Sequence, residues 1–246
     1  MVESFKTALR ESNMAENTIS AYVYAVNDYF AKYKTLNKRN LLLYKANLIE
    51  QFKPKTVNLR IQALNKFLVH AEKPKLRLKS VKVQQRTYLE NVISQADYIF
   101  LKKRLKQEEN LMWYFVVRFL TATGARVSEL IQIKVEHVRI GYFDIYSKGG
   151  KVRRLFIPKL LRDEAKKWFE EIQQTTGYIF RNRFGERITT RGIAQQLKKY
   201  AERYGLNTNV VYPHSFRHRY AKNFLERFND IALLADLMGH ESIETT

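Results

Sequence analysis

The sequence predicts a mainly helical protein with a small β-hairpin, in which an N-terminal helical domain precedes a mixed α/β domain. Glycine (9) and proline (4) are scarce among the 246 residues, which favours long helices over turn-rich β architecture. Apolar residues recur at helical spacing along most of the chain, and one stretch alternates on both sides of a Gly-Gly turn. Hydrophobic residues make up 45% of the chain, enough for a buried core.

Residues 1–72 are predicted to form a small all-helical domain. Residues 13–16 resemble a capping box, and the apolar residues after them share one helical face. Pro54 suits the first turn of another helix, whose apolar stripe runs over 57–68. A shorter helix is expected between them, over 41–52.

Residues 73–90 break the helical pattern because basic and apolar residues alternate there. A buried strand would not carry so many lysines, so the segment is predicted to be an extended basic linker. It can be a solvated connector or a strap that lies along a polyanionic backbone.

Residues 91–246 are predicted to form the α/β domain. Ser94 offers a cap for the first of two helices, over 94–106 and 111–122. Strands over 138–147 and 152–157 are expected to pair across the turn between them as a hairpin. Further helices are expected over 160–174, 190–204, 215–227 and 231–238.

The net charge of +20 arises from 44 basic and 24 acidic residues. Residues 1–90 hold 17 basic and 7 acidic residues (+10), and residues 91–246 hold 27 and 17 (+10). A field that is positive over both halves attracts polyanions, of which nucleic acid is the commonest. A ribosomal or anionic membrane surface is the alternative partner.

Several classes are excluded by what the sequence lacks. Without cysteine there is no disulfide, thiolate metal site or cysteine nucleophile. The N-terminus lacks a signal-peptide pattern, and no apolar run approaches the ~18 residues of a membrane span. We expect a soluble cytoplasmic protein.

Two candidate basic residues lie where the chain changes direction. Arg126 follows a glycine between two predicted helices, where its planar guanidinium can present several donors to a phosphate. Lys148 lies at the hairpin tip beside two glycines, where an amine can enter a DNA groove and protonate a leaving oxygen. Taken singly, each also fits an ordinary exposed side chain.

Three further candidates lie in the last predicted helices. His214 and Arg217 occupy positions i and i+3 after Pro213, so the imidazole and the guanidinium share one face. His240 follows the glycine that caps the final helix. A zinc site from His214 and His218 is disfavoured, because no carboxylate follows at ligand spacing and an arginine lies between them. No metal is expected.

These motifs, in this order, resemble the tyrosine recombinases of the phage integrase family, above all its Xer-like and transposon-integrase members. The resemblance rests on Ala-Arg126-Val-Ser-Glu129-Leu, Lys148-Gly-Gly-Lys, His214-x-x-Arg217 and Leu-Met-Gly-His240. It implies a two-domain DNA clamp with a four-helix core-binding domain over 1–72, a basic linker over 73–90 and a catalytic domain over 91–246.

The resemblance also implies site-specific DNA recombination (integration, excision or resolution) by strand cleavage and rejoining through a 3′-phosphotyrosyl intermediate. Arg126 and Arg217 would clamp the scissile phosphate. Lys148 would be the general acid for the 5′-hydroxyl, His214 would assist proton transfer at the nucleophile, and His240 would bond a non-bridging oxygen. No cofactor is implied, because the phosphotyrosyl bond conserves the energy of the phosphodiester.

The family's nucleophilic tyrosine would lie about nine residues after His240, past Thr246. None of the 15 tyrosines occupies that place, and the last of them, Tyr220, is expected to face the core. We therefore expect this chain to bind DNA without cleaving it. Truncation before the tyrosine is the favoured explanation, and the alternatives are a disordered tail or a tyrosine supplied in trans.

The expected partner is a double-stranded DNA recombination site, bound by a homotetramer in the cytoplasm or nucleoid of a bacterium or on behalf of a phage or mobile element. Accessory directionality factors are further candidate partners, and no membrane is expected. Candidate DNA contacts lie on the Pro54 helix, the linker and the 189–198 segment. They are Lys55, Asn58, Arg60, Lys79, Lys82, Thr189 and Arg191.

Two other functions compete with recombination. A non-catalytic DNA-binding or architectural protein that reuses the same fold would show the same motifs. A metal-dependent nuclease or transposase is disfavoured because Asp144, Asp163 and Glu164 form no acidic motif.

Overall fold

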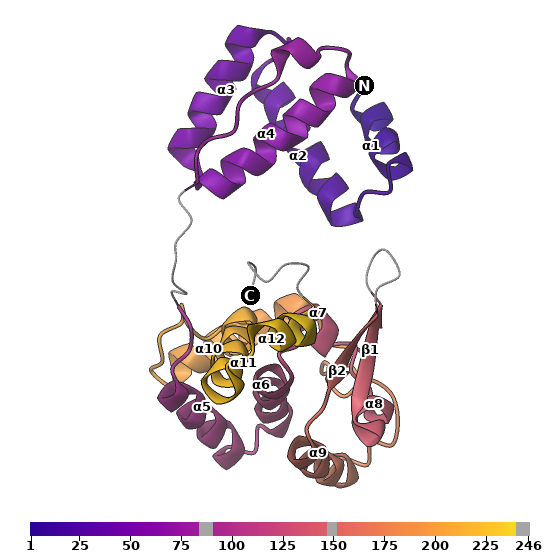
Figure 1. Ribbon diagram of the computed structural model, residues 1–246, viewed down its shortest axis with the longest axis vertical. Coiled ribbons are helices and arrows are strands. Elements are labelled where there is room, and N and C mark those ends of the chain that lie inside the picture. Colours follow the sequence, from indigo (N-terminus) through magenta and orange to yellow (C-terminus); the bar gives the residue numbers. More distant parts are fainter. Residues whose placement is uncertain (84–90, 147–151, 240–246) are drawn as a thin grey trace. The chain divides into compact units, whose positions relative to one another are not determined.

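The computed structural model describes residues 1–83, 91–146 and 152–239, and the chain divides into two compact units, Met1–Thr87 and Tyr88–Thr246 (Figure 1). Each unit has its own hydrophobic core. The predicted architecture, mainly helical with a small antiparallel hairpin, is confirmed. None of the described helices is long and apolar enough to cross a membrane.

Over its described residues, the N-terminal unit is built from four α-helices around a core of aliphatic and aromatic side chains. These helices are α1 (Val2–Glu11), α2 (Glu16–Lys32), α3 (Lys38–Gln51) and α4 (Pro54–His70). The rings of Tyr29 and Tyr44 meet edge to face at 5.3 Å, a favourable packing of two quadrupoles. The prediction of helices near 41 and from Pro54 is confirmed, and Pro54 occupies the first turn.

The predicted capping box at residues 13–16 is wrong. Asn13 lies in a left-handed turn with φ 53°, and Ala15 precedes α2 without any side-chain cap. The turn is needed because α1, which sequence periodicity did not single out, ends only a few residues earlier.

The basic segment after α4 is not a free linker over its first part. A short 3-10 turn, η1 (Pro74–Leu76), leads into an extended strap, residues 77–82, in which Leu78 is 5% exposed and joins the core of the N-terminal unit. The Asn65 amide bonds both the N–H and the C=O of Leu78, at 2.8 and 2.9 Å. Asn58 bonds both groups of Val81 in the same way. The strap therefore lies on protein, with its lysines turned outward.

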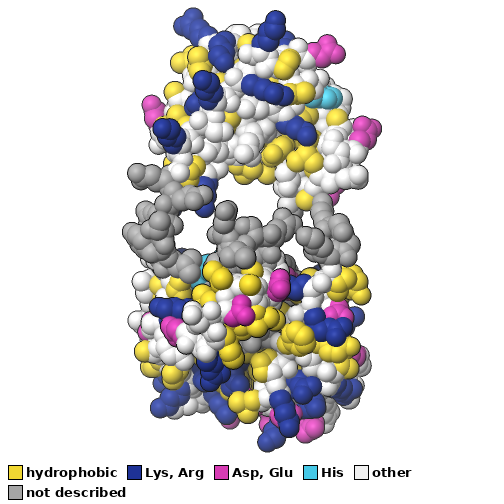
Figure 2. Space-filling model, in the orientation of Figure 1, with side chains coloured by type: hydrophobic (Ala, Val, Ile, Leu, Met, Phe, Trp, Pro, Cys, Tyr) yellow, Lys and Arg dark blue, Asp and Glu magenta, His cyan; other side chains and the backbone are white. Residues whose placement is uncertain are grey.

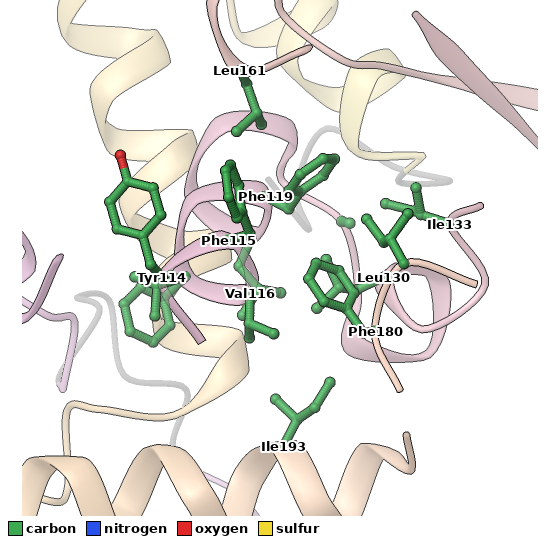
Figure 3. Close-up of a cluster of buried hydrophobic side chains, with 14 of the residues drawn as sticks. Tyr114, Phe115, Val116, Phe119, Leu130, Ile133, Leu161, Phe180 and Ile193 are labelled. Atoms are coloured by element: carbon green, nitrogen blue, oxygen red, sulfur yellow. The ribbon is translucent and has the colours of Figure 1, made fainter. Parts of the chain in front are cut away.

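The C-terminal unit is organised around α6 (Leu111–Thr123), which is buried on most of its surface (Figure 3). The Phe115 ring stacks on Trp168 at 4.6 Å, and Phe119 meets Phe180 edge to face at 5.7 Å. The other helices are α5 (Gln95–Gln107), α7 (Val127–Leu130), α8 (Val135–Ile140), α9 (Lys159–Glu171), α10 (Thr190–Arg203), α11 (Pro213–Phe228) and α12 (Ile231–Met238). Ser94 caps α5 as predicted.

The predicted hairpin consists of β1 (Tyr142–Tyr146) and β2 (Val152–Phe156), paired antiparallel. The first strand starts later than predicted, because residues 135–140 form α8, which ends at Gly141 with φ 93°. The predicted turn over 148–151 lies outside the described residues.

The last helix, α12, has a core of its own. Leu234 and Met238 pack on Ala221 of α11 in a small apolar cluster that is separate from the main core. Gly239 ends α12 in a left-handed conformation with φ 63°, as the predicted glycine cap requires. The apolar attachment of α12 therefore depends mainly on α11, whose partly buried Tyr220, Phe224 and Leu225 also pack on this cluster.

We predict that Asn65→Ala frees the strap, because the substitution leaves the N–H and C=O of Leu78 without the amide. The expected loss is about 1–3 kcal/mol of unfolding free energy, measured by urea unfolding of the whole chain. Trypsin should also cleave faster after Lys79 and Lys82. The control is Asn17→Ala, an exposed asparagine of α2. Equal cleavage rates in the two variants would show that the asparagine does not hold the strap.

Candidate phosphate-binding site

Arg126 lies at the junction of α6 and α7. Gly124 ends α6 with φ 62°, and a Cβ there would lie 2.5 Å from the Tyr220 ring, so only glycine fits this turn. The Glu129 carboxylate accepts from the backbone N–H of Arg126 at 2.7 Å and from its guanidinium at 2.9 Å. The Arg126 side chain is still 42% exposed, so part of it is open to an anion.

His214 and Arg217 lie on the first turns of α11, which begins at Pro213. Ser215 and Arg219 fix this end of the helix by bonding the backbone of Ile93, at 2.7 Å to its N–H and 2.6 Å to its C=O. His214 is at the surface, whereas Arg217 is only 1% exposed.

Arg217 is buried because its guanidinium bonds backbone carbonyls from two distant parts of the chain. It donates to Gly124 O at 2.5 Å, beside Arg126, and to Met238 O at 2.7 Å, at the end of α12. The structure therefore brings Arg126 and Arg217 together, as the sequence predicted. The pairing also places the end of α12 at the same site.

Three arginines converge on the carbonyl end of α12. Arg126 donates to Gly239 O at 3.2 Å, and Arg153 of β2 donates to Leu237 O at 2.6 Å, next to the bond from Arg217. The last carbonyls of a helix have no partner within it and carry partial negative charge, so they suit cationic donors. These carbonyls occupy donors that a phosphate oxygen could use.

The Glu129 carboxylate balances part of this charge. It is 6% exposed and also accepts from Arg153 at 2.5 Å. Three guanidiniums and one carboxylate leave the cluster of Arg126, Arg153, Arg217 and Glu129 with a net charge of +2 (3 − 1). A basic cluster with one exposed guanidinium is suited to binding a phosphodiester.

Sequence reasoning missed Arg153. The signal that could have found it is the alternation along β2, which places Arg153 on the same face as the buried Leu155 and turns Arg154 outward. An arginine on the inward face of a strand needs a buried partner, and here that partner is Glu129.

Burial and the charges of the cluster lower the pKa values of Arg217 and His214. Burial, with repulsion from Arg126, lowers the pKa of Arg217 to about 10, so the guanidinium is still charged at neutral pH. Partial burial, followed by repulsion from Arg217 and Arg126, lowers the pKa of His214 below its ordinary value. A neutral imidazole beside two guanidiniums can accept a proton from a reacting hydroxyl.

The ring of Tyr220 packs against Gly124, next to Arg126. Burial raises its pKa, so it is a neutral packing residue rather than an activated phenol. Two of the predicted site residues, Lys148 and His240, lie outside the described residues.

The predicted DNA-contact residues divide into two groups. Lys55, Lys79, Lys82, Thr189 and Arg191 are exposed, although the Thr189 hydroxyl already caps α10. Asn58 and Arg60 instead make hydrogen bonds within the N-terminal unit. The Asn58 amide bonds Val81, and the Arg60 guanidinium bonds Asp28 at 2.7 Å and stacks on Phe52 at 4.3 Å. Both polar groups therefore already have partners within the N-terminal unit.

The described residues contain no group of three or more His, Cys, Asp or Glu arranged to hold a metal ion. The rings of His214 and His218 pack edge to face, with centroids 4.5 Å apart. Within the described part of the chain, the polar chemistry of the site therefore comes from guanidinium, imidazole and carboxylate groups.

The comparisons with known proteins identify the family. The model of the phage integrase family matches residues 89–246, well over half of the chain, so the chain belongs to this family. The tyrosine recombinase XerA of Pyrococcus furiosus is 28% identical over all of this chain and 87% of its own length.

Two solved structures share the fold at low sequence identity. The Tn1549 transposon integrase in complex with transposon right-end DNA has a TM-score of 0.75 at 13% identity, over 99% of this chain and 92% of that one. The lambda integrase tetramer bound to a Holliday junction has a TM-score of 0.76 at 15% identity, over 98% and 76%.

We predict that Glu129→Gln destabilises the C-terminal unit by about 3 kcal/mol at neutral pH, because it removes a buried carboxylate that accepts from both Arg126 and Arg153. Burial acts to raise the pKa of Glu129, but the bond from the Arg126 N–H and the attraction of Arg153 outweigh it, so the pKa is lowered.

A lowered carboxylate pKa adds stability above the unfolded pKa of about 4.5, and this stability is lost as the pH falls through the folded pKa. The difference in unfolding free energy between the original chain and Glu129→Gln should therefore shrink between pH 6 and pH 3, measured by urea unfolding at each pH. A difference that is independent of pH would contradict the role given to the carboxylate.

Proposed function

We propose that this chain is a site-specific DNA recombinase that cleaves and rejoins strands through a 3′-phosphotyrosyl intermediate. The observation that carries the proposal is the convergence of Arg126, His214 and Arg217 at one basic site, although the first lies far from the other two in the sequence. Membership of the phage integrase family supports the reaction class.

In this proposal, Arg126 and Arg217 bind the scissile phosphate and stabilise the charge that develops on the five-coordinate phosphorus. Arg126 is partly open and would make the first contact. Arg217 is covered, so it would reach the phosphate only after Met238 O moves aside. His214 accepts the proton of the nucleophile, and Lys148 and His240 take the roles that the resemblance gives them.

We propose that both units contact duplex DNA. The domain limits of the sequence analysis carry over with one change, since residues 77–82 fold on the N-terminal unit. Figure 2 shows dark blue Lys and Arg side chains spread over the visible face of this unit, with few acidic ones. Lys55, Lys79 and Lys82 are the proposed phosphate contacts here, and Thr189 and Arg191 are those of the C-terminal unit.

A homotetramer is the proposed active assembly, since the lambda integrase, which shares the fold, is a tetramer on a Holliday junction. Exchange of strands between two duplexes requires cleavage at four places, which four identical subunits supply. Directionality factors would be additional partners.

A function limited to DNA binding is the second candidate. It is favoured by the carbonyls of α12, which occupy donors of Arg126 and Arg217 in this conformation. A chain in which these contacts persist on DNA would bind without reacting. The two functions differ in whether a covalent protein–DNA bond forms.

We propose from the resemblance that the nucleophile follows Thr246, so the test uses the chain together with any residues that its gene encodes after this position. The 246-residue chain serves for comparison and is expected to bind without reacting. Both are incubated with a pool of nicked genomic duplex fragments, and denaturant-resistant protein–DNA adducts are isolated and sequenced. We expect adducts on 3′ phosphates that share one sequence. Binding without any adduct would favour the second function.

We predict that Arg126→Ala lowers the rate of adduct formation at least about 100-fold, because it removes a donor that acts on the transition state. The DNA dissociation constant should change by less than about 3-fold, since the other basic residues remain. The control is Arg139→Ala, an exposed arginine of α8. If Arg126→Ala weakened binding as much as it slowed reaction, Arg126 would be a DNA-positioning contact only.

A further inference from the structure

We propose that Arg153 is a positioning residue of the phosphate site, which fixes Glu129 and the end of α12 relative to each other. The inference rests on the proposed function and adds a residue to which neither the sequence motifs nor the family resemblance gave a role. Arg153 itself need not touch DNA, because it acts through the orientation of Arg126 and of the last turn of α12.

The contacts of Arg153 join three separate elements. Its guanidinium donates to Glu129 of α7 at 2.5 Å and to Leu237 O of α12 at 2.6 Å, while its backbone pairs with Ile145 in the hairpin. The side chain is 11% exposed. A Cβ at Gly239 would overlap the Arg153 side chain, so the glycine cap of α12 also makes room for it.

The contact with Glu129 determines how Arg126 is presented. One oxygen of the carboxylate accepts from the Arg126 guanidinium, and the other accepts from both Arg153 and the Arg126 backbone N–H. If Arg153 is removed, the carboxylate can rotate toward Arg126 or toward solvent. Arg126 then loses its fixed orientation while it keeps its charge, and a reaction at phosphorus is sensitive to such small displacements.

The contact with Leu237 determines where α12 ends. The apolar attachment of α12 is the small cluster around Leu234 and Met238, so polar bonds from β2 and α11 supply much of the remaining restraint. The chain that follows Gly239 carries His240 and, by the resemblance, the nucleophile. The bond from Arg153 fixes Leu237 O beside Met238 O, the carbonyl that accepts from Arg217.

Lysine cannot replace this arginine. The two acceptors lie on different elements and are reached by two nitrogens of one planar group, whereas a lysine amine is a single point donor. The next residue, Arg154, supplies a matched control. Its side chain lies on the face of β2 opposite to Arg153 and is 47% exposed. It donates to Asp144 at 2.8 Å and stacks on the ring of Tyr142 in β1.

The experiment uses the continued chain and the DNA duplex that adduct sequencing recovers. Lysine and methionine variants are made at both positions: Arg153→Lys, Arg153→Met, Arg154→Lys and Arg154→Met. For each variant we measure the melting temperature, the DNA dissociation constant and the single-turnover rate of adduct formation. We expect the Arg153 variants to react at least about 30-fold more slowly with dissociation constants within about 3-fold of the original. The Arg154 variants should keep both values within about 3-fold.

A double-mutant cycle separates positioning from general structural damage. If Arg153 acts in part through Glu129, the slowing in Arg153→Met combined with Glu129→Gln should be clearly smaller than the product of the two single effects. Multiplying losses would overturn the inference, as would an Arg153→Lys variant that reacts at the original rate. Parallel losses of binding and rate would also overturn it. If Arg153→Met does not fold, Arg153→Lys decides the question, because it keeps the charge and most of the bulk.

The two proposals fail in different ways. An inactive Arg126→Ala variant together with fully active Arg153 variants would refute the positioning role alone. An Arg126→Ala variant that reacts at the original rate, or a continued chain that forms no adduct, would refute the proposed function and this inference with it.

Discussion

The contact between the Glu129 carboxylate and two guanidiniums is the interaction on which the rest of the site depends. Folding brings Arg126, Arg153 and Arg217 around the end of one helix, and their mutual repulsion acts against that arrangement. One buried carboxylate and the carbonyl end of α12 offset it. Because the offset is incomplete, the cluster keeps the positive charge that an anion can neutralise.

The elements that carry the site are held in two different ways. Arg126 and Arg217 are anchored to α6 and α11, which belong to the main core. The attachment of α12 has a smaller apolar component and depends on hydrogen bonds to these arginines. A phosphate that entered the site would compete with the α12 carbonyls for the same donors. In the proposed function, a bound phosphate would therefore displace some of the hydrogen bonds that hold α12.

Much of the fold could be predicted because helical periodicity and turn residues are local signals. Pro54, Ser94 and Gly239 each end or begin a helix where the sequence placed that boundary. The sequence wrongly predicts a strand over residues 138–140, which belong to α8. A short alternating run fits a strand and a helical turn equally well. The strap could not be predicted, because its place depends on Asn58 and Asn65, which lie in another element.

The candidate site was predictable only in part. The family motifs named Arg126, His214 and Arg217, and the structure brings these three together. Arg153 carries no motif, and its role depends on packing between β2, α7 and α12 that no local pattern encodes. Arg60 shows the reverse case, a basic residue on a predicted DNA-facing helix that the fold uses against Asp28.

The most direct test of the central claim is the pKa of His214, measured by NMR titration of its ring protons in the free chain and on the recovered DNA duplex. If Arg126 and Arg217 share one phosphate site with His214, partial burial and the repulsion of both guanidiniums hold the pKa of His214 below its ordinary value in the free chain. It then rises on DNA, since the phosphate offsets both guanidiniums. A pKa at its ordinary value in the free chain, or one that DNA leaves unchanged, would contradict the account.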